Sequence, residues 1–114
     1  MAKRKQGKRP RKVVATETYT DDDGNRLELR TTLSPATVAK IGERPRSAAA
    51  SIDDAWQRRE EMLFERLAVS WTIAGLPISG QKLLVGRYRM APPAERRWIR
   101  ATIEAHVDRW IPGL

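Results

Sequence analysis

The chain has 114 residues, no cysteine and a formal net charge of +8. This length fits one domain with a modest core, and a chain without cysteine has neither disulfides nor thiolate metal sites. No stretch approaches the roughly 20 apolar residues of a membrane span, and no apolar signal segment opens the chain, so we expect a cytoplasmic protein or one inside an assembled particle.

The positive charge is concentrated in residues 1–12. This segment holds seven Lys and Arg and no acid, which leaves 15 cations against 14 acids in the rest of the chain. We expect a disordered arm, because so few apolar residues cannot offset the entropy cost of ordering. The arm predicts non-specific binding to the phosphate backbone of nucleic acid, with a solubilising tail, an anionic membrane surface or an acidic protein as alternatives. The predicted nucleic-acid-binding residues are Lys3, Arg4, Lys5, Lys8, Arg9, Arg11 and Lys12.

The segment 13–33 is predicted to form a β-hairpin. Residues 13–20 are rich in Val, Thr and Tyr, and leucines alternate with charged residues over 26–33. Between the two runs, the Asp, Gly and Asn residues of 21–25 form a turn cluster. An isolated hairpin is marginally stable in water, so its leucine face must rest on a helix or on a partner.

A short helix follows the hairpin. Ser34 is a good N-cap residue before Pro35 at the first helical position, and Gly42 can end the helix. The small and proline-containing residues 43–50 are interpreted as a linker.

The best-marked helix is predicted over 52–74. Ser51 supplies an N-cap, and the acids of the first turn favour the positive end of the helix dipole. Gly75 and Pro77 end the helix. Its apolar residues recur at helical spacing and form one stripe: Ile52, Trp56, Leu63, Leu67, Trp71 and Ala74.

Two further helices are predicted over 80–90 and 93–111. Gly86 costs the first of them roughly 1 kcal/mol relative to Ala, so we expect close packing or a bend there. The predicted fold is therefore mainly α. It is a single domain over 13–114, in which a hairpin and a short helix are followed by a three-helix unit over 51–111.

Nothing in the sequence predicts a catalytic residue, a metal site or a cofactor. The one histidine, His106, lies beside the apolar face of the last helix, where a lone histidine is usually packed or hydrogen-bonded. Glu60, Glu61 and Glu65 lie within helical pairing distance of arginines and are interpreted as a salt-bridged face. The aspartates of 21–23 lack the glycine and the final acid of a calcium loop, so we interpret them as turn residues.

The tryptophans are the most informative residues. Trp56, Trp71 and Trp110 lie on apolar faces and are predicted to be core residues. Trp98 lies off the apolar stripe of its helix and among arginines. It either packs against the hairpin or the short helix, or serves as an aromatic anchor for a protein or a nucleic-acid base. The candidate partner-binding residues are Arg96, Arg97, Trp98 and Arg100.

The run Ser-Trp-Thr-Ile-Ala-Gly over 70–75 precedes two predicted helices. Over residues 66–108 this arrangement resembles the small helical antitoxins that inhibit Fic-type AMP-transferases. Those proteins carry a Ser/Thr-x-x-x-Glu-Gly/Asn motif, whose Glu engages an arginine at the nucleotide site of the enzyme. This chain has Ala74 in the place of that Glu, so no functional residue is transferred.

The leading hypothesis is a non-catalytic accessory protein encoded by a phage, a plasmid or a chromosome. Its basic arm binds nucleic acid without sequence preference, and its nearly neutral helical body binds a protein partner or a second copy. One alternative is a component of a phage virion or of head or tail assembly. The other alternative is an antitoxin-like regulator of a partner enzyme.

Overall fold

The structure is a computed structural model that describes residues 15–42 and 52–114, with side chains described from residue 57 onward in the second range. The basic arm of 1–12, the linker of 43–50 and the helix cap at Ser51 therefore lie outside the described residues. The side chains of Ile52 and Trp56, two members of the predicted stripe, also lie outside them.

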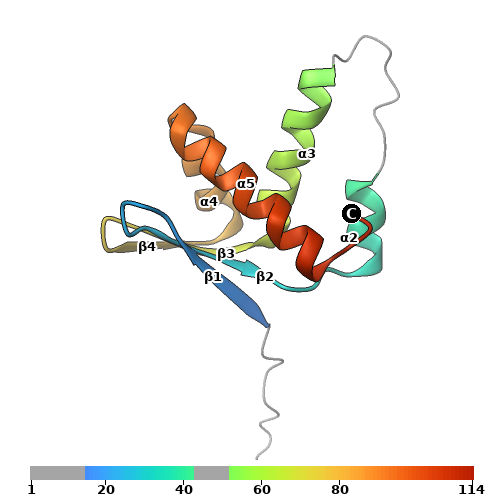
Figure 1. The fold of residues 1–114 in the computed structure, drawn as a ribbon, viewed down its shortest axis with the longest axis horizontal. Coiled ribbons are helices and arrows are strands. Elements are labelled where there is room, and N and C mark those ends of the chain that lie inside the picture. Colours follow the sequence, from blue (N-terminus) through green and yellow to red (C-terminus); the bar gives the residue numbers. More distant parts are fainter. Residues whose placement is uncertain (1–14, 43–51) are drawn as a thin grey trace, which may run out of the picture.

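The described residues form a four-stranded antiparallel sheet with helices on one of its faces (Figure 1). The strand order β1-β2-β3-β4 follows the chain, and two helices lie between β2 and β3. The strands are β1 Thr16–Thr20, β2 Arg26–Arg30, β3 Ala68–Ile73 and β4 Leu76–Ser79. The helices are α2 Pro35–Ile41, α3 Ile52–Leu67, α4 Gln81–Arg89 and α5 Pro93–Trp110.

The predicted mainly α class is wrong, because residues 68–79 form a β-hairpin and the fold is α+β. Helix α3 ends at Leu67, seven residues before the end of the predicted helix. The residues that follow include Val, Trp, Thr and Ile, which favour strands. Ala74 and Gly75 have φ angles of 52° and 80°. Positive φ at both central residues is the requirement of a type I′ turn, so Gly75 closes a hairpin instead of capping a helix.

The turn between β1 and β2 is built by Asp21. Its carbonyl oxygen accepts a hydrogen bond from the Gly24 N–H at 3.1 Å, and its N–H donates to the Asn25 carbonyl at 2.9 Å. Its carboxylate accepts from the N–H groups of Asp23 and Asn25. Gly24 has a φ of +84°, which completes a three-residue turn with a glycine bulge. Asp21 therefore stabilises the turn through hydrogen bonds of both its backbone and its carboxylate.

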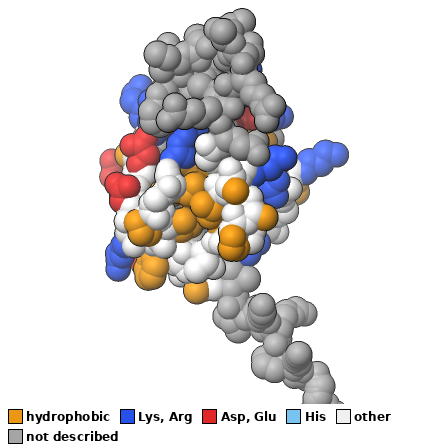
Figure 2. Space-filling model, turned by 90° about the vertical axis from the view of Figure 1, so that its right-hand side faces the viewer, with side chains coloured by type: hydrophobic (Ala, Val, Ile, Leu, Met, Phe, Trp, Pro, Cys, Tyr) orange, Lys and Arg blue, Asp and Glu red, His pale blue; other side chains and the backbone are white. Residues whose placement is uncertain are grey.

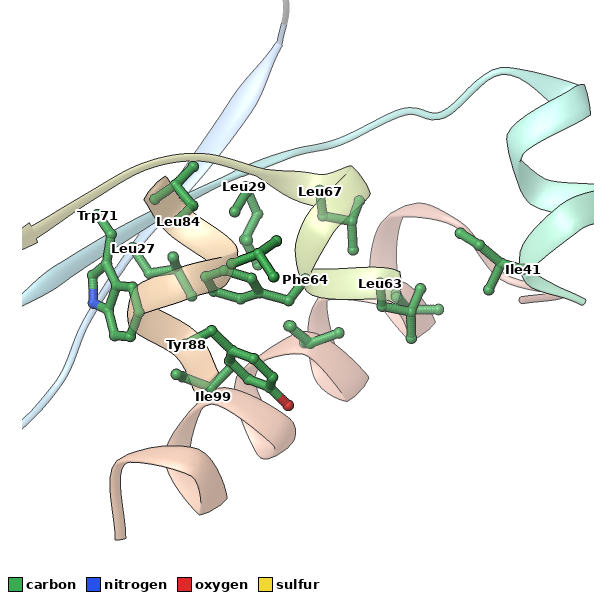
Figure 3. Close-up of a cluster of buried hydrophobic side chains, with 14 residues drawn as sticks. Leu27, Leu29, Ile41, Leu63, Phe64, Leu67, Trp71, Leu84, Tyr88 and Ile99 are labelled. Atoms are coloured by element: carbon green, nitrogen blue, oxygen red, sulfur yellow. The ribbon is translucent and has the colours of Figure 1, made fainter. Parts of the chain in front are cut away.

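The core lies between the helices and the covered face of the sheet (Figure 3). Phe64 is at its centre: its ring stacks on Tyr88 with centroids 4.7 Å apart and meets the edge of Trp71 at 5.6 Å. Sequence reasoning assigned no role to Phe64, although its side chain is fully buried. The other large buried side chains are Leu27, Leu29, Leu63, Leu67, Leu84, Ile99 and Ile103.

His106 ties α5 to the sheet. Its side chain is only 1% exposed, and both ring nitrogens have hydrogen-bond partners. Nε2 lies 2.7 Å from the carbonyl oxygen of Arg30 in β2. A carbonyl only accepts, so Nε2 donates to it, and Nδ1 forms a hydrogen bond with the Tyr19 hydroxyl at 2.6 Å. One side chain of α5 thereby contacts both strands of the first hairpin.

The other face of the sheet is polar. The cross-strand register places Thr16, Glu28 and Ser70 on this face, because partners in neighbouring strands share a face. The Glu28 carboxylate accepts hydrogen bonds from the hydroxyls of Thr16 at 2.6 Å and Ser70 at 2.9 Å. The helices lie on the opposite side of the sheet (Figure 1), so the described residues bury one sheet face.

Candidate protein-interaction surface

The predicted partner-binding residues of α5 are mostly engaged within the chain. The Arg96 guanidinium lies 5.1 Å from the centre of the Tyr88 ring and donates to the Arg89 carbonyl. Arg100 pairs with Glu60 of α3. Trp98 is half-buried and packs against the core, whereas Arg97 is exposed. Most of this segment therefore holds α5 against α3 and α4.

The carboxylates between the helices are paired with arginines as well. Glu61 receives two hydrogen bonds from Arg89, at 2.7 and 3.0 Å, and these bonds lower the pKa of its carboxyl group. Glu95 pairs with Arg87 at 2.8 Å. Among the described residues, no group of three or more His, Cys, Asp or Glu could hold a metal ion.

A surface that the sequence analysis did not identify lies on β4 and α4. Three of the four large apolar side chains that are exposed in the described residues lie in β4, in α4 or at the C-cap of α4: Leu76 at 71%, Leu83 at 67% and Met90 at 80%. Leu83 and Met90 border a groove of about 580 Å³ between the strand and the helix. We call it the α4 groove, lined by Pro77, Ile78, Ser79, Lys82, Leu83, Gly86, Arg87 and Met90.

The α4 groove explains the glycine within α4. Gly86 is helical and exposed, and a Cβ added there would meet nothing within 4 Å. Neither a positive φ nor packing within the chain therefore requires glycine, although glycine weakens a helix. Of the two predicted reasons for Gly86, close packing or a bend, close packing is not found among the described residues. An unobstructed helix backbone in an apolar groove instead fits close approach by another molecule.

The charges of the α4 groove have one sign. Lys82 and Arg87 line it, and no acid does. Arg87 also pairs with Glu95 and lies 5.1 Å from the centre of the Trp71 ring, so its position is fixed by the core. Lys82 is exposed. A complementary ligand would thus present apolar side chains next to carboxylates.

The sequence signal for this surface is a second stripe on α4. The buried residues of the helix are Leu84, Val85 and Tyr88. Leu83, Gly86 and Met90 are spaced by three and four residues and form a neighbouring stripe. Leu83 is 67% exposed, so this second stripe faces solvent.

A second apolar region lies at the end of the molecule that carries α2. Figure 2 shows orange side chains gathered at the middle of this face, with basic side chains beside them.

No helix in the described part of the chain is both long and apolar enough to cross a membrane. Comparisons with protein-family models, curated proteins and solved structures find no match to this chain. Residues 70–75, which carry the antitoxin resemblance, form β3 and the hairpin turn.

Proposed function

We propose that this protein is a non-catalytic accessory protein with two separate contacts. The α4 groove binds an apolar segment of a protein partner, and the basic arm of residues 1–12 binds the phosphate backbone of nucleic acid. The observation that carries the proposal is that Leu83 and Met90, each more than two-thirds exposed, line one apolar groove. Grouped apolar side chains of this kind are typical of protein-interaction sites, whereas single ones are common on any surface.

The magnitude of apolar burial supports a protein ligand. Burying one Leu or Met side chain contributes about 1.5–3 kcal/mol, so the side chains around the α4 groove can supply much of the free energy of a specific complex. Lys82, the exposed cation on its rim, favours a partner segment with a flanking carboxylate. An amphipathic helix or an extended segment with such a pattern meets both requirements.

The groove is tested by two substitutions that should weaken partner binding without destabilising the free protein. Gly86→Ala should stabilise α4 by about 0.5–1 kcal/mol, because alanine is the better helix former. It should nevertheless weaken partner binding, because its methyl group enters the groove. Leu83→Asp should abolish binding without unfolding the chain, because an acid in the first helical turn is favourable. Thermal melts and partner co-purification measure the two effects.

Ala94→Asp is the matched control, because Ala94 is exposed in the first turn of α5. It should bind the partner as the unsubstituted protein does. The groove assignment fails if Gly86→Ala stabilises the protein and leaves partner binding unchanged.

The arm is tested by its salt dependence. Seven phosphate contacts predict that log affinity for duplex DNA falls with log salt at a slope of up to about −6. Deletion of residues 1–12 should remove most of the affinity and leave the melting midpoint nearly unchanged. Filter binding at several salt concentrations measures the slope. A truncated chain that retains most of its affinity would refute the assignment.

A further inference from the structure

The two edge strands of the sheet differ in their capacity to pair with another strand. Ile73 and Leu76 flank the two-residue turn and form a hydrogen-bonded pair, so the next pair, Thr72 and Pro77, does not exchange bonds. The backbone of residue 77 therefore faces away from β3. Proline has no N–H to offer there, and a proline on an edge is a common obstacle to strand addition.

The β1 edge has no such obstacle. The N–H of Thr31 donates to the Ala15 carbonyl at 3.0 Å, and the N–H of Asp21 donates to Asn25. Hydrogen-bonded and non-hydrogen-bonded residue pairs alternate along an antiparallel pair of strands. These two bonds therefore show that the backbone groups of the odd-numbered residues of β1 point toward β2. The N–H and C=O groups of Thr16, Thr18 and Thr20 consequently point away from the sheet.

We propose that β1 pairs antiparallel with β1 of a second copy of this chain, centred on Thr18. The two four-stranded sheets then become one continuous sheet with all helices on the same face. Thr18 then faces Thr18 of the second copy. Thr16 faces Thr20 of the second copy, and Thr20 faces Thr16 of the second copy. Each of these three facing pairs can exchange two backbone hydrogen bonds, about six in all. Facing threonines are favourable cross-strand neighbours.

The charges near β1 favour this register. Glu17 and Tyr19 lie on the helix-covered face, and Glu17 faces Tyr19 of the second copy. Arg109 of α5 lies near Tyr19: burial and Glu17 raise the pKa of the tyrosine, and Arg109 lowers it. Glu17 of one copy thus meets Arg109 of the other. Trp110 lies beside the same contact between the two β1 strands. Its side chain is 39% exposed, and Arg109 lies over its ring.

Parallel pairing through the same edge would place the helices of the two copies on opposite faces of the joined sheet. In the antiparallel register, Thr16 of one copy lies roughly 14 Å along the strands from Thr16 of the other.

The test measures the mass of the full-length chain in solution. Light scattering after size exclusion, at about 100 µM protein and about 0.3 M salt to screen the arms, should give a dimer. Thr18→Pro should weaken dimerisation at least about 100-fold, because it removes an outward donor and places a ring at the centre of the seam. The bonds between β1 and β2 do not use the Thr18 N–H, so the melting midpoint should stay close to that of the unsubstituted protein.

Thr18→Val is the matched control, since it keeps the β-branch and the N–H, and it should remain dimeric. Glu17→Lys should weaken the dimer, and the double variant Glu17→Lys/Arg109→Glu should restore it. The single Glu17→Lys variant and the double variant together keep the test decisive if Thr18→Pro fails to fold. A monomeric unsubstituted chain, or a folded Thr18→Pro variant as dimeric as the unsubstituted chain, would overturn the proposal. These outcomes are independent of the α4 groove.

Discussion

Trp71→Ala should cost about 3–5 kcal/mol of folding free energy and remove most of the cooperative transition. The Trp71 side chain is 1% exposed, and its ring meets Phe64 on one side while the Arg87 guanidinium lies 5.1 Å from its centre. Leu27 is its cross-strand neighbour. Removing the indole would leave a cavity between the sheet and α4. Urea denaturation followed by circular dichroism measures the loss.

Trp110→Ala is the control for this experiment, because its ring is 39% exposed at the end of α5. It should cost less than about 1 kcal/mol. A Trp71→Ala variant that unfolds within 1 kcal/mol of the unsubstituted protein would contradict the position of the indole in the core.

His106→Ala should cost about 2–4 kcal/mol, because two hydrogen bonds and a buried ring are lost together. The Arg30 carbonyl loses its donor, and the Tyr19 hydroxyl loses its hydrogen-bond partner. Tyr19→Phe removes only the second of these bonds and should cost about 1 kcal/mol. Urea denaturation of both single variants and of the double variant gives their coupling energy.

A coupling energy near zero between the two positions would contradict the bond between them. The same series separates the two bonds of the ring. The excess cost of His106→Ala over Tyr19→Phe reports the contact with β2 together with the packing of the ring.

The hairpin of residues 68–79 was hidden by two overlapping patterns. Leu63, Leu67 and Trp71 are spaced by four residues and fit one helix face, yet Trp71 also alternates with Ile73 as in a strand. Its turn is Ala-Gly, without the Asn-Gly or Asp-Gly pair that marks a type I′ turn. In the structure, pairing of Trp71 with Leu27 and Ile78 decides between the patterns. That contact joins residues far apart in the sequence, so local periodicity could not reveal it.

The elements with strong local signals were more accessible to prediction. Ser34 caps α2, its hydroxyl accepting from the Thr37 N–H at 3.2 Å, and the proline after it is the first residue of the helix. The turn at 21–25 likewise follows from its own residues. The α4 groove could not be predicted from the sequence, because α4 carries apolar residues on two neighbouring faces. Only the positions of the other elements decide which face is buried.

The α5 segment shows the same limit. Its arginines and Trp98 look like an exposed cluster in the sequence, since the helix stripe excludes them. In the structure Arg96 lies over Tyr88 and Arg100 pairs with Glu60, both on other elements. Arginine side chains that a sequence pattern places on the exposed face of a helix can thus form contacts between helices.

The most direct test of the proposed function is the recovery of a protein partner from nuclease-treated extracts of the native host. The chain without residues 1–12 should recover the partner as well as the full chain does, because the α4 groove alone makes that contact. Leu83→Asp should lose the partner and keep its affinity for duplex DNA, whereas Ala94→Asp should keep both. Equal recovery by Leu83→Asp and the unsubstituted chain would contradict the account.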